Sequence, residues 1–263
     1  MLRHRETTDI QDIEDKELKM NTPALFLRFV AGDPLVGPEA IASALEHADG
    51  VVLDLPFSDP IAVPPALEAA HDRALSRGTR IEDALEVVRR VKAATGKHVI
   101  VPVVSNLAYV NDFDRLTARI RAAGADEVML PDVPVVMREA EPVWEATAQV
   151  NEIPLTVSIA PTQTKAGFEK ALAHAADTLL ISFTPTSKPF GVLANENLPA
   201  RVLVETPAFE GPFKAAAAEL VKKGPATGII LETEPVTILS GNGPAEGAEA
   251  LERFLGDVRA ALA

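Results

Sequence analysis

The unit that decides the fold runs from residue 24 to residue 55 and reads ALFLRFVAGDPLVGPEAIASALEHADGVVLDL. Its first seven and last six residues form apolar, β-prone runs, and residues 38–47 between them are predicted to be helical. Continuously apolar runs are typical of strands that are covered on both faces. The stretch therefore predicts a strand–helix–strand unit with parallel strands.

The same alternation continues to the end of the chain. Further strands are expected at 98–104, 126–130, 154–160, 177–183, 200–205 and 226–232, nearly all followed by helices with apolar residues at three and four spacing. Eight parallel units with right-handed crossovers in 263 residues favour a closed α/β barrel, the (β/α)₈ or TIM barrel, over an open sheet. No Gly-rich nucleotide-binding loop follows the first strand. We expect one barrel domain over residues 21–263, preceded by an extension or short helix at 1–20 in which Met20 is an alternative start.

One unit departs from this pattern. The segment TPTSKPFGVLANENLP at 184–199 holds three prolines and a glycine, so the sixth outer helix is expected to be missing or much shortened. The bare barrel wall then needs a cover. Either a second copy of the chain covers it, which predicts a homo-oligomer, or the loop folds down with Phe190, Val192 and Leu193 as its own cover.

Composition limits the classes of partner. The formal net charge of −13 disfavours binding to nucleic acid and to anionic membranes. The chain has no cysteine, which excludes disulfides, thiolate nucleophiles and zinc–thiolate sites. No apolar run approaches the roughly 20 residues of a transmembrane helix, and no signal peptide is seen. We expect a cytoplasmic protein that acts on a small molecule, and the sequence indicates no cofactor.

Two charged residues stand out on the first two strands. Alternation along 24–30 places Leu25, Leu27 and Phe29 on one face and Phe26, Arg28 and Val30 on the other. The leucine face suits the outer helices, so Arg28 should point into the barrel. A buried arginine needs an anionic partner, and Asp54 on the adjacent strand is the natural one. Asp54 is our candidate acid/base, or it only caps a loop. Arg28 is either a substrate anchor or a structural clamp.

Five short segments carry a family resemblance. They are AGDP at 31–34, PFSDPIA at 56–62, AAHDRALSRGT at 69–79, AGADEVMLPDVP at 123–134 and IAPTQT at 159–164. In order and spacing the chain resembles the tryptophan synthase α family. The resemblance implies a barrel that splits indole-3-glycerol phosphate with a glutamate in the second strand and an aspartate after PFSDP. It also implies a phosphate site at the turns after strands seven and eight, and a β subunit that contacts the PFSDP loop.

The chain departs from that family at the places that carry its chemistry. The strand-two glutamate falls on Val52 and the loop aspartate on Val63, and valine handles no proton. The phosphate-binding turns fall on Glu205-Thr206-Pro207 and on Glu232-Thr233. Proline removes a donor, and like charges 4 Å apart cost roughly 4 kcal/mol at an effective dielectric of about 20. Glu205 and Glu232 instead favour a cation, either an amine, a developing carbocation or a metal, or they are solvated rim residues.

Other side chains are weaker candidates. Asn106 and Asp132 are expected to hold loop geometry, Lys188 to close over a ligand from loop six, and Tyr109 to donate a hydrogen bond near the mouth. We expect His47, His71, His98 and His174 to lie away from the mouth. The predicted substrate-binding set is Val52, Val63, Asn106, Tyr109, Asp132, Lys188, Glu205, Glu232 and Thr233, with Asp54 and Arg28 as the catalytic pair and no metal ligand.

Three functions remain open. The first is a lyase-type or cyclisation enzyme of altered chemistry that does not cleave indole-3-glycerol phosphate. The second is a noncatalytic α-like subunit that binds a β-subunit-like partner. The third is an ordinary indole-3-glycerol-phosphate lyase of tryptophan biosynthesis.

Overall fold

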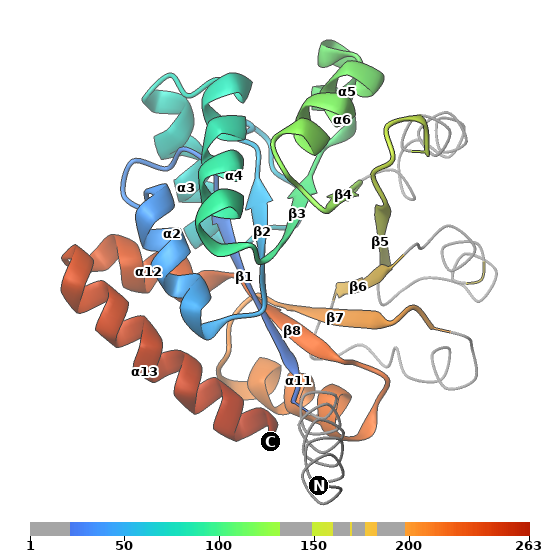
Figure 1. Ribbon diagram of the computed structural model, residues 1–263. Coiled ribbons are helices and arrows are strands. Elements are labelled where there is room, and N and C mark those ends of the chain that lie inside the picture. The colour runs from blue at the N-terminus through green and yellow to red at the C-terminus, as the bar shows by residue number, and fades with distance from the viewer. Residues whose placement is uncertain (1–21, 132–148, 160–168, 170–176, 183–197) are drawn as a thin grey trace, which may run out of the picture.

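Eight parallel strands close into a barrel in chain order in the computed structural model, which describes residues 22–131, 149–159, 169, 177–182 and 198–263 (Figure 1). The predicted (β/α)₈ barrel is thereby confirmed. The strands are β1 Ala24–Val30, β2 Gly50–Asp54, β3 His98–Pro102, β4 Glu127–Met129, β5 Leu155–Ile159, β6 Thr178–Ser182, β7 Arg201–Thr206 and β8 Gly228–Leu231.

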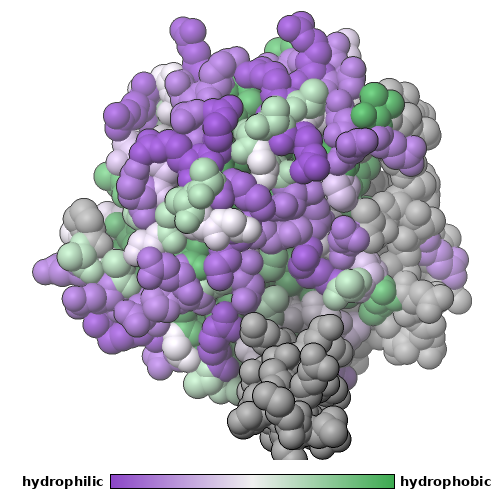
Figure 2. Space-filling view, viewed as in Figure 1, coloured by the Kyte–Doolittle hydropathy of each residue, from purple (hydrophilic) through white to green (hydrophobic). Residues whose placement is uncertain are grey.

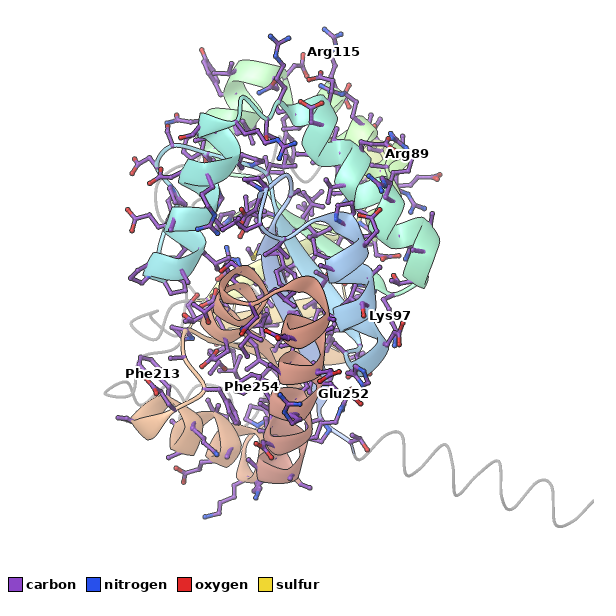
Figure 3. The ribbon with its side chains drawn as sticks, turned by 90° about the vertical axis from the view of Figure 1, so that its left-hand side faces the viewer. Arg89, Lys97, Arg115, Phe213, Glu252 and Phe254 are labelled. Carbon is purple, nitrogen blue, oxygen red and sulfur yellow. The ribbon has the colours of Figure 1, made fainter. Side chains whose placement is uncertain are left out.

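Helices cover the outside of this barrel. They are α2 Pro38–Ala44 with a 3-10 turn η1 at Leu45–His47, α3 Pro65–Ser76, α4 Ile81–Thr95, α5 Ser105–Asn111, α6 Phe113–Ala122, α11 Gly211–Lys223, α12 Thr233–Gly241 and α13 Pro244–Leu262. Charged side chains such as Arg89 and Arg115 point outward from them (Figure 3). Hydrophilic residues accordingly dominate the face seen in Figure 2. No helix in the described ranges is long and apolar enough to cross a membrane.

Helix α4 shows how local sequence produces this outer layer. Its buried residues Ala84, Leu85, Val88 and Val91 recur at helical spacing and form one apolar stripe. The Arg80 N–H donates to Asp83 Oδ2 at 3.0 Å where the helix begins, and Gly96 ends the helix in the left-handed conformation with φ of 63°.

The barrel interior consists of three layers of side chains, a polar one on each side of an apolar one. The apolar middle layer comprises Phe26, Val52, Ile100, Met129, Leu180, Leu203 and Ile230. Strand alternation places the neighbouring inward residues one step toward either end of the barrel. As predicted, Phe26 and Arg28 point inward and Leu25, Leu27 and Phe29 pack outward, whereas Val30 packs with the outer cluster at the end of β1.

The layer at the N-terminal ends of the strands is a closed polar network around Glu127, which is 1% exposed. Its carboxylate accepts hydrogen bonds from Thr156 Oγ1 at 2.5 Å, Thr178 Oγ1 at 2.7 Å and Arg201 Nη1 at 2.8 Å, and contacts His98 Nε2 at 2.7 Å. Burial favours the neutral acid, but the hydrogen bonds from His98, Thr156 and Thr178 outweigh it and lower the pKa of Glu127. We call these five residues the base network. Because their polar groups bond to one another at the N-terminal end of the barrel, we interpret the base network as a structural feature.

Some of the predicted elements fall outside the described residues. These are the extension at 1–20, most of the helix-poor segment at 184–199, and most of the helices expected after β4 and β5. Two short helices, α5 and α12, were not predicted from the sequence. Both begin directly after a strand, at the end of the barrel where β1 to β8 terminate, which we call the mouth.

Candidate functional site

The mouth is built around Arg28, whose side chain is 6% exposed. Its Nε donates to Asp54 Oδ2 at 2.8 Å and its Nη2 to Asp54 Oδ1 at 3.0 Å. Its Nη1 lies 2.5 Å from Glu232 Oε1 and 3.3 Å from Glu205 Oε1. One guanidinium therefore joins three carboxyl groups, and we call these four residues the mouth cluster.

Strand order explains why the four residues meet. β1 pairs with β2 on one side and with β8 on the other, and Arg28 lies one inward step from the end of β1. Val30 is in register with Asp54, and β7 pairs with β8, which brings Glu205 beside Glu232. The predicted Arg28–Asp54 partnership is confirmed. Glu205 and Glu232 were expected to favour a bound cation or to be solvated rim residues; both contact the guanidinium of Arg28 and neither is a solvated rim residue, while binding of an external cation stays a prediction.

Burial shapes the charge of the cluster. Loss of water around Arg28 opposes its charge, but Asp54 and Glu232 outweigh that effect and raise the pKa of the guanidinium. Burial raises the pKa of Glu232 to about 8; Arg28 opposes this shift and Glu205 adds to it. Burial therefore favours the protonated form of Glu232, beside an arginine that stays charged.

Two serines that sequence analysis did not single out extend the mouth cluster. Ser182 Oγ donates to Glu205 Oε2, and Ser158 Oγ lies 3.2 Å from Ser182 Oγ. Ser182 is two residues beyond Leu180, which lies in the middle layer. Strand alternation could therefore have predicted that the Ser182 side chain points into the barrel. The polar layer thus reaches across β5 and β6 as well.

Three hydrogen-bond donors at the turns after β7 and β8 already have partners within the chain. The Phe209 N–H donates to Glu234 Oε1, and Thr233 Oγ1 donates to the Pro207 carbonyl. The Glu232 N–H donates to the Thr206 carbonyl at 3.3 Å. An anion site at such turns needs free donors, and these three are engaged.

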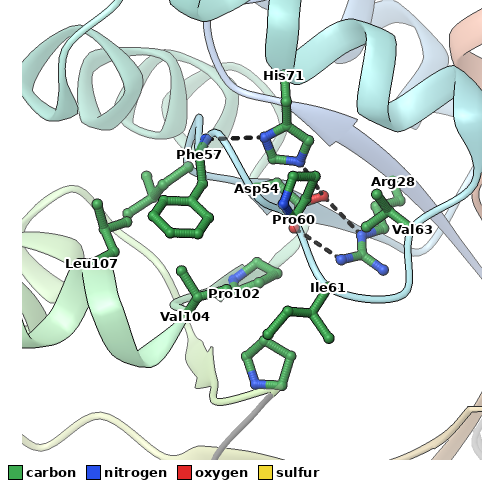
Figure 4. A pocket seen from close by; sticks show the side chains of 12 residues that line it. Arg28, Asp54, Phe57, Pro60, Ile61, Val63, His71, Pro102, Val104 and Leu107 are labelled. Carbon is green, nitrogen blue, oxygen red and sulfur yellow. Dashed lines mark hydrogen bonds and ion pairs between the residues drawn. The ribbon is translucent and has the colours of Figure 1, made fainter.

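The two valines lie on β2 and in the loop that follows it. Val52 is fully buried in the apolar middle layer; it lies two residues before Asp54 on β2, one layer further from the mouth. Val63 is half-buried in the loop after β2 and lines a small cavity at the mouth (Figure 4). Neither position offers a group that exchanges protons.

His71 corrects one of our expectations. Predicted to lie away from the mouth, it points from α3 toward Asp54, with Nε2 3.9 Å from Asp54 Oδ2 (Figure 4). The Phe57 N–H donates to its Nδ1 at 3.2 Å. The missed signal was helical spacing, because Leu67, Ala70, His71 and Ala74 share the buried face of α3.

The remaining candidates do not join the mouth cluster. Asn106 and Tyr109 lie on α5 as exposed residues, Tyr109 at 84%, so the expected hydrogen bond from Tyr109 into the mouth is not formed. His47 and His98 lie away from the mouth as predicted. Asp132, Lys188 and His174 fall outside the described residues. Within the described ranges, no group of three His, Asp or Glu residues has the geometry to hold a metal ion.

Comparisons with known proteins agree with this architecture. The family model described as tryptophan synthase alpha chain matches residues 16–184. The chain is 31% identical to the tryptophan synthase alpha chain of Picosynechococcus sp., over 94% of this chain and 97% of that one. It is 30% identical to the Streptomyces coelicolor protein of the same name, over 89% of each.

Solved structures show the same fold. Tryptophan synthase from M. tuberculosis, in its aminoacrylate- and BRD0059-bound form, superposes with a TM-score of 0.78 at 23% identity, covering 95% of this chain and 96% of that one. The family match, the relatives and the closed barrel agree, and the chain belongs to the tryptophan synthase alpha chain family.

Proposed function

We propose that this barrel is a lyase-type or cyclisation enzyme of altered chemistry, acting on a small molecule other than indole-3-glycerol phosphate. The observation that carries the proposal is the mouth cluster, in which Arg28 is buried against Asp54, Glu205 and Glu232. Buried, convergent charged groups at the carboxyl ends of barrel strands are the usual location of an active site.

The turns after β7 and β8 argue against a phosphate-bearing substrate. Three of their donors are engaged within the chain, namely the Phe209 N–H, the Glu232 N–H and the Thr233 hydroxyl, and Pro207 has no N–H to offer. The carboxylate of Glu205 adds repulsion, which the guanidinium of Arg28 at 3.3 Å reduces below the roughly 4 kcal/mol that two isolated like charges 4 Å apart cost at an effective dielectric of about 20. The family match also ends at residue 184, before β7 and β8.

The mouth cluster offers one group that accepts a proton and one that delivers it. Asp54 is held in a bidentate ion pair and is the proposed proton acceptor. Burial raises the pKa of Glu232 to about 8, and its protonated carboxyl group is the proposed donor. Lyases and cyclases need a proton removed at one atom and returned at another, and Arg28 fixes the distance between the two carboxyl groups.

A second candidate is the ordinary family reaction, the cleavage of indole-3-glycerol phosphate. The comparisons favour it, because relatives up to 31% identical over 94% of this chain carry the name tryptophan synthase alpha chain. On this account, other groups replace the acids that the family resemblance places at Val52 and Val63.

A third candidate is a noncatalytic subunit for a β-subunit-like partner. It is favoured by the segment PFSDPIA at 56–62, which keeps the sequence of the loop that contacts the β subunit in the family. Ile61 in that loop is 42% exposed, as an interface residue of a free subunit would be.

One assay separates the three candidates. Indole release from indole-3-glycerol phosphate is measured for the chain alone and with a tryptophan synthase β chain added. Altered chemistry predicts no indole in either mixture and no change in the β reaction. Indole at ordinary rates contradicts our proposal in favour of the family reaction, and stimulation of the β chain without indole supports the noncatalytic subunit. Once the native reaction is known, Asp54→Asn should abolish it.

A further inference from the structure

The side chain of His71 has one nitrogen in use and one without a hydrogen bond. Because the Phe57 N–H must donate, Nδ1 accepts and the ring carries its proton on Nε2. Burial lowers the pKa of His71, opposed by Asp54 and Asp72 and reinforced by Arg28, which keeps the ring neutral. His71 therefore presents a fixed N–H donor at Nε2.

This donor is buried and lacks an acceptor. The His71 side chain is 4% exposed, and Nε2 has no hydrogen-bond partner among the described residues. A buried donor left unpaired is costly, so such groups normally meet a ligand or a water molecule. The nearest carboxylate oxygen, Asp54 Oδ2, lies 3.9 Å away, too far for a direct bond but suitably placed for an intervening oxygen atom.

His71, Asp54 and Arg28 are among the residues that line a small cavity (Figure 4). Its volume of about 20 Å³ admits a single water-sized group beside His71, Asp54 and Arg28. The other walls are apolar and include Leu55, Phe57, Ile61, Val63, Pro102 and Leu107. The cavity thus has room for one hydroxyl-sized group at its polar end, and the remainder of a larger ligand lies outside it, at the open mouth of the barrel.

We infer that this cavity is a subsite for the hydroxyl group of a neutral, otherwise apolar small molecule, with His71 Nε2–H donating to the hydroxyl oxygen and Asp54 accepting its proton. A hydroxyl both accepts and donates, as the pair requires. A carbonyl cannot donate to Asp54, an ammonium cannot accept from His71, and an anion is repelled by Asp54. The Arg28 donors are already engaged by Asp54, Glu205 and Glu232.

This subsite shares the mouth with the proposed function and deepens it, but its test uses binding alone and not turnover. The probes are benzyl alcohol and ethylbenzene, which have the same shape and differ by one hydroxyl. Dissociation constants are measured by NMR titration for the wild type, His71→Phe and His47→Phe, the last being a matched control at an exposed histidine.

We expect His71→Phe to shift the affinity ratio of the two probes about five- to tenfold toward ethylbenzene, the value of one hydrogen bond. His47→Phe should leave the ratio unchanged. In the wild type, benzyl alcohol and not ethylbenzene should shift the ¹⁵N resonance of His71 Nε2. The inference is overturned by an unchanged ratio, by equal ¹⁵N shifts, or by failure of both probes to bind. The ¹⁵N readout decides even where His71→Phe does not fold.

Discussion

Arg28 is the residue on which the mouth depends, because its removal leaves the carboxylate of Asp54 buried without a counter-charge and takes from Glu205 and Glu232 the donor that they share. We predict that Arg28→Met lowers the free energy of unfolding by about 3–5 kcal/mol, the usual cost of breaking a buried ion pair. Urea denaturation measures the change.

Arg89→Met is the matched control for this substitution. Arg89 pairs with Glu86 on the surface of α4, where both side chains are 53% exposed. Such pairs contribute less than about 1 kcal/mol. Equal effects of the two substitutions would show that Arg28 is not an essential counter-charge.

The raised pKa of Glu232 predicts how the free energy of unfolding depends on pH. The pKa of Glu232 is about 8 in the folded chain, and its ordinary value is 4.5. Between pH 4.5 and pH 8 the folded state therefore holds a proton that the unfolded state has released. The free energy of unfolding should therefore fall as pH rises from about 5 to about 8. Glu232→Gln, which is neutral throughout, should flatten this part of the curve. An unchanged slope in urea titrations at several pH values would mean that Glu232 is ionised.

Individual site residues were predictable where strand alternation applies. Arg28 and Asp54 followed from two adjacent strands and from the need of a buried charge for a partner. Sequence alone did not show that Glu205 and Glu232 share the same guanidinium, because barrel closure brings β8 against β1. His71 was missed because it reaches the site from α3, and its direction depends on how that helix packs on the barrel.

At the scale of elements, β2 begins with a glycine that packing requires. A Cβ on Gly50 would lie 2.3 Å from the Phe26 ring in the middle of the barrel. We predict that Gly50→Ala lowers the free energy of unfolding by about 1–3 kcal/mol through overpacking.

Gly256→Ala is the control with the opposite sign. Gly256 lies within α13, and a Cβ at this position would meet nothing within 4 Å. Alanine there should raise the free energy of unfolding by about 0.5–1 kcal/mol. Thermal and urea denaturation of both variants check the pair, and a stabilising Gly50→Ala would contradict the packing described for Phe26.

Strands were more predictable than short helices for a physical reason. Each apolar run at 24–30 or 98–104 is buried on both faces and marks its strand directly. Helix α5 has only seven residues, too few for an isolated helix to persist in water, so its formation depends on its place after β3. Helix α12 likewise begins immediately after β8.

At the scale of the whole molecule, the segment at 184–199 predicts association of two or more copies. Its prolines disfavour an outer helix, and an uncovered apolar barrel wall is a contact surface. Multi-angle light scattering should give a multiple of the 28.0 kDa chain mass. A monomer across the concentration range would favour the alternative in which the loop itself covers the wall.

We propose that the mouth of this α-family barrel does not accept a phosphate. Calorimetric titration of glycerol 3-phosphate, with glycerol as the matched neutral ligand, tests it without any assumption about turnover. The mouth cluster predicts no saturable heat beyond that of glycerol, because Glu205 repels the anion and three donors of the turns are engaged. Saturable binding that is specific to the phosphate would contradict the claim and return the chain to the ordinary chemistry of its family.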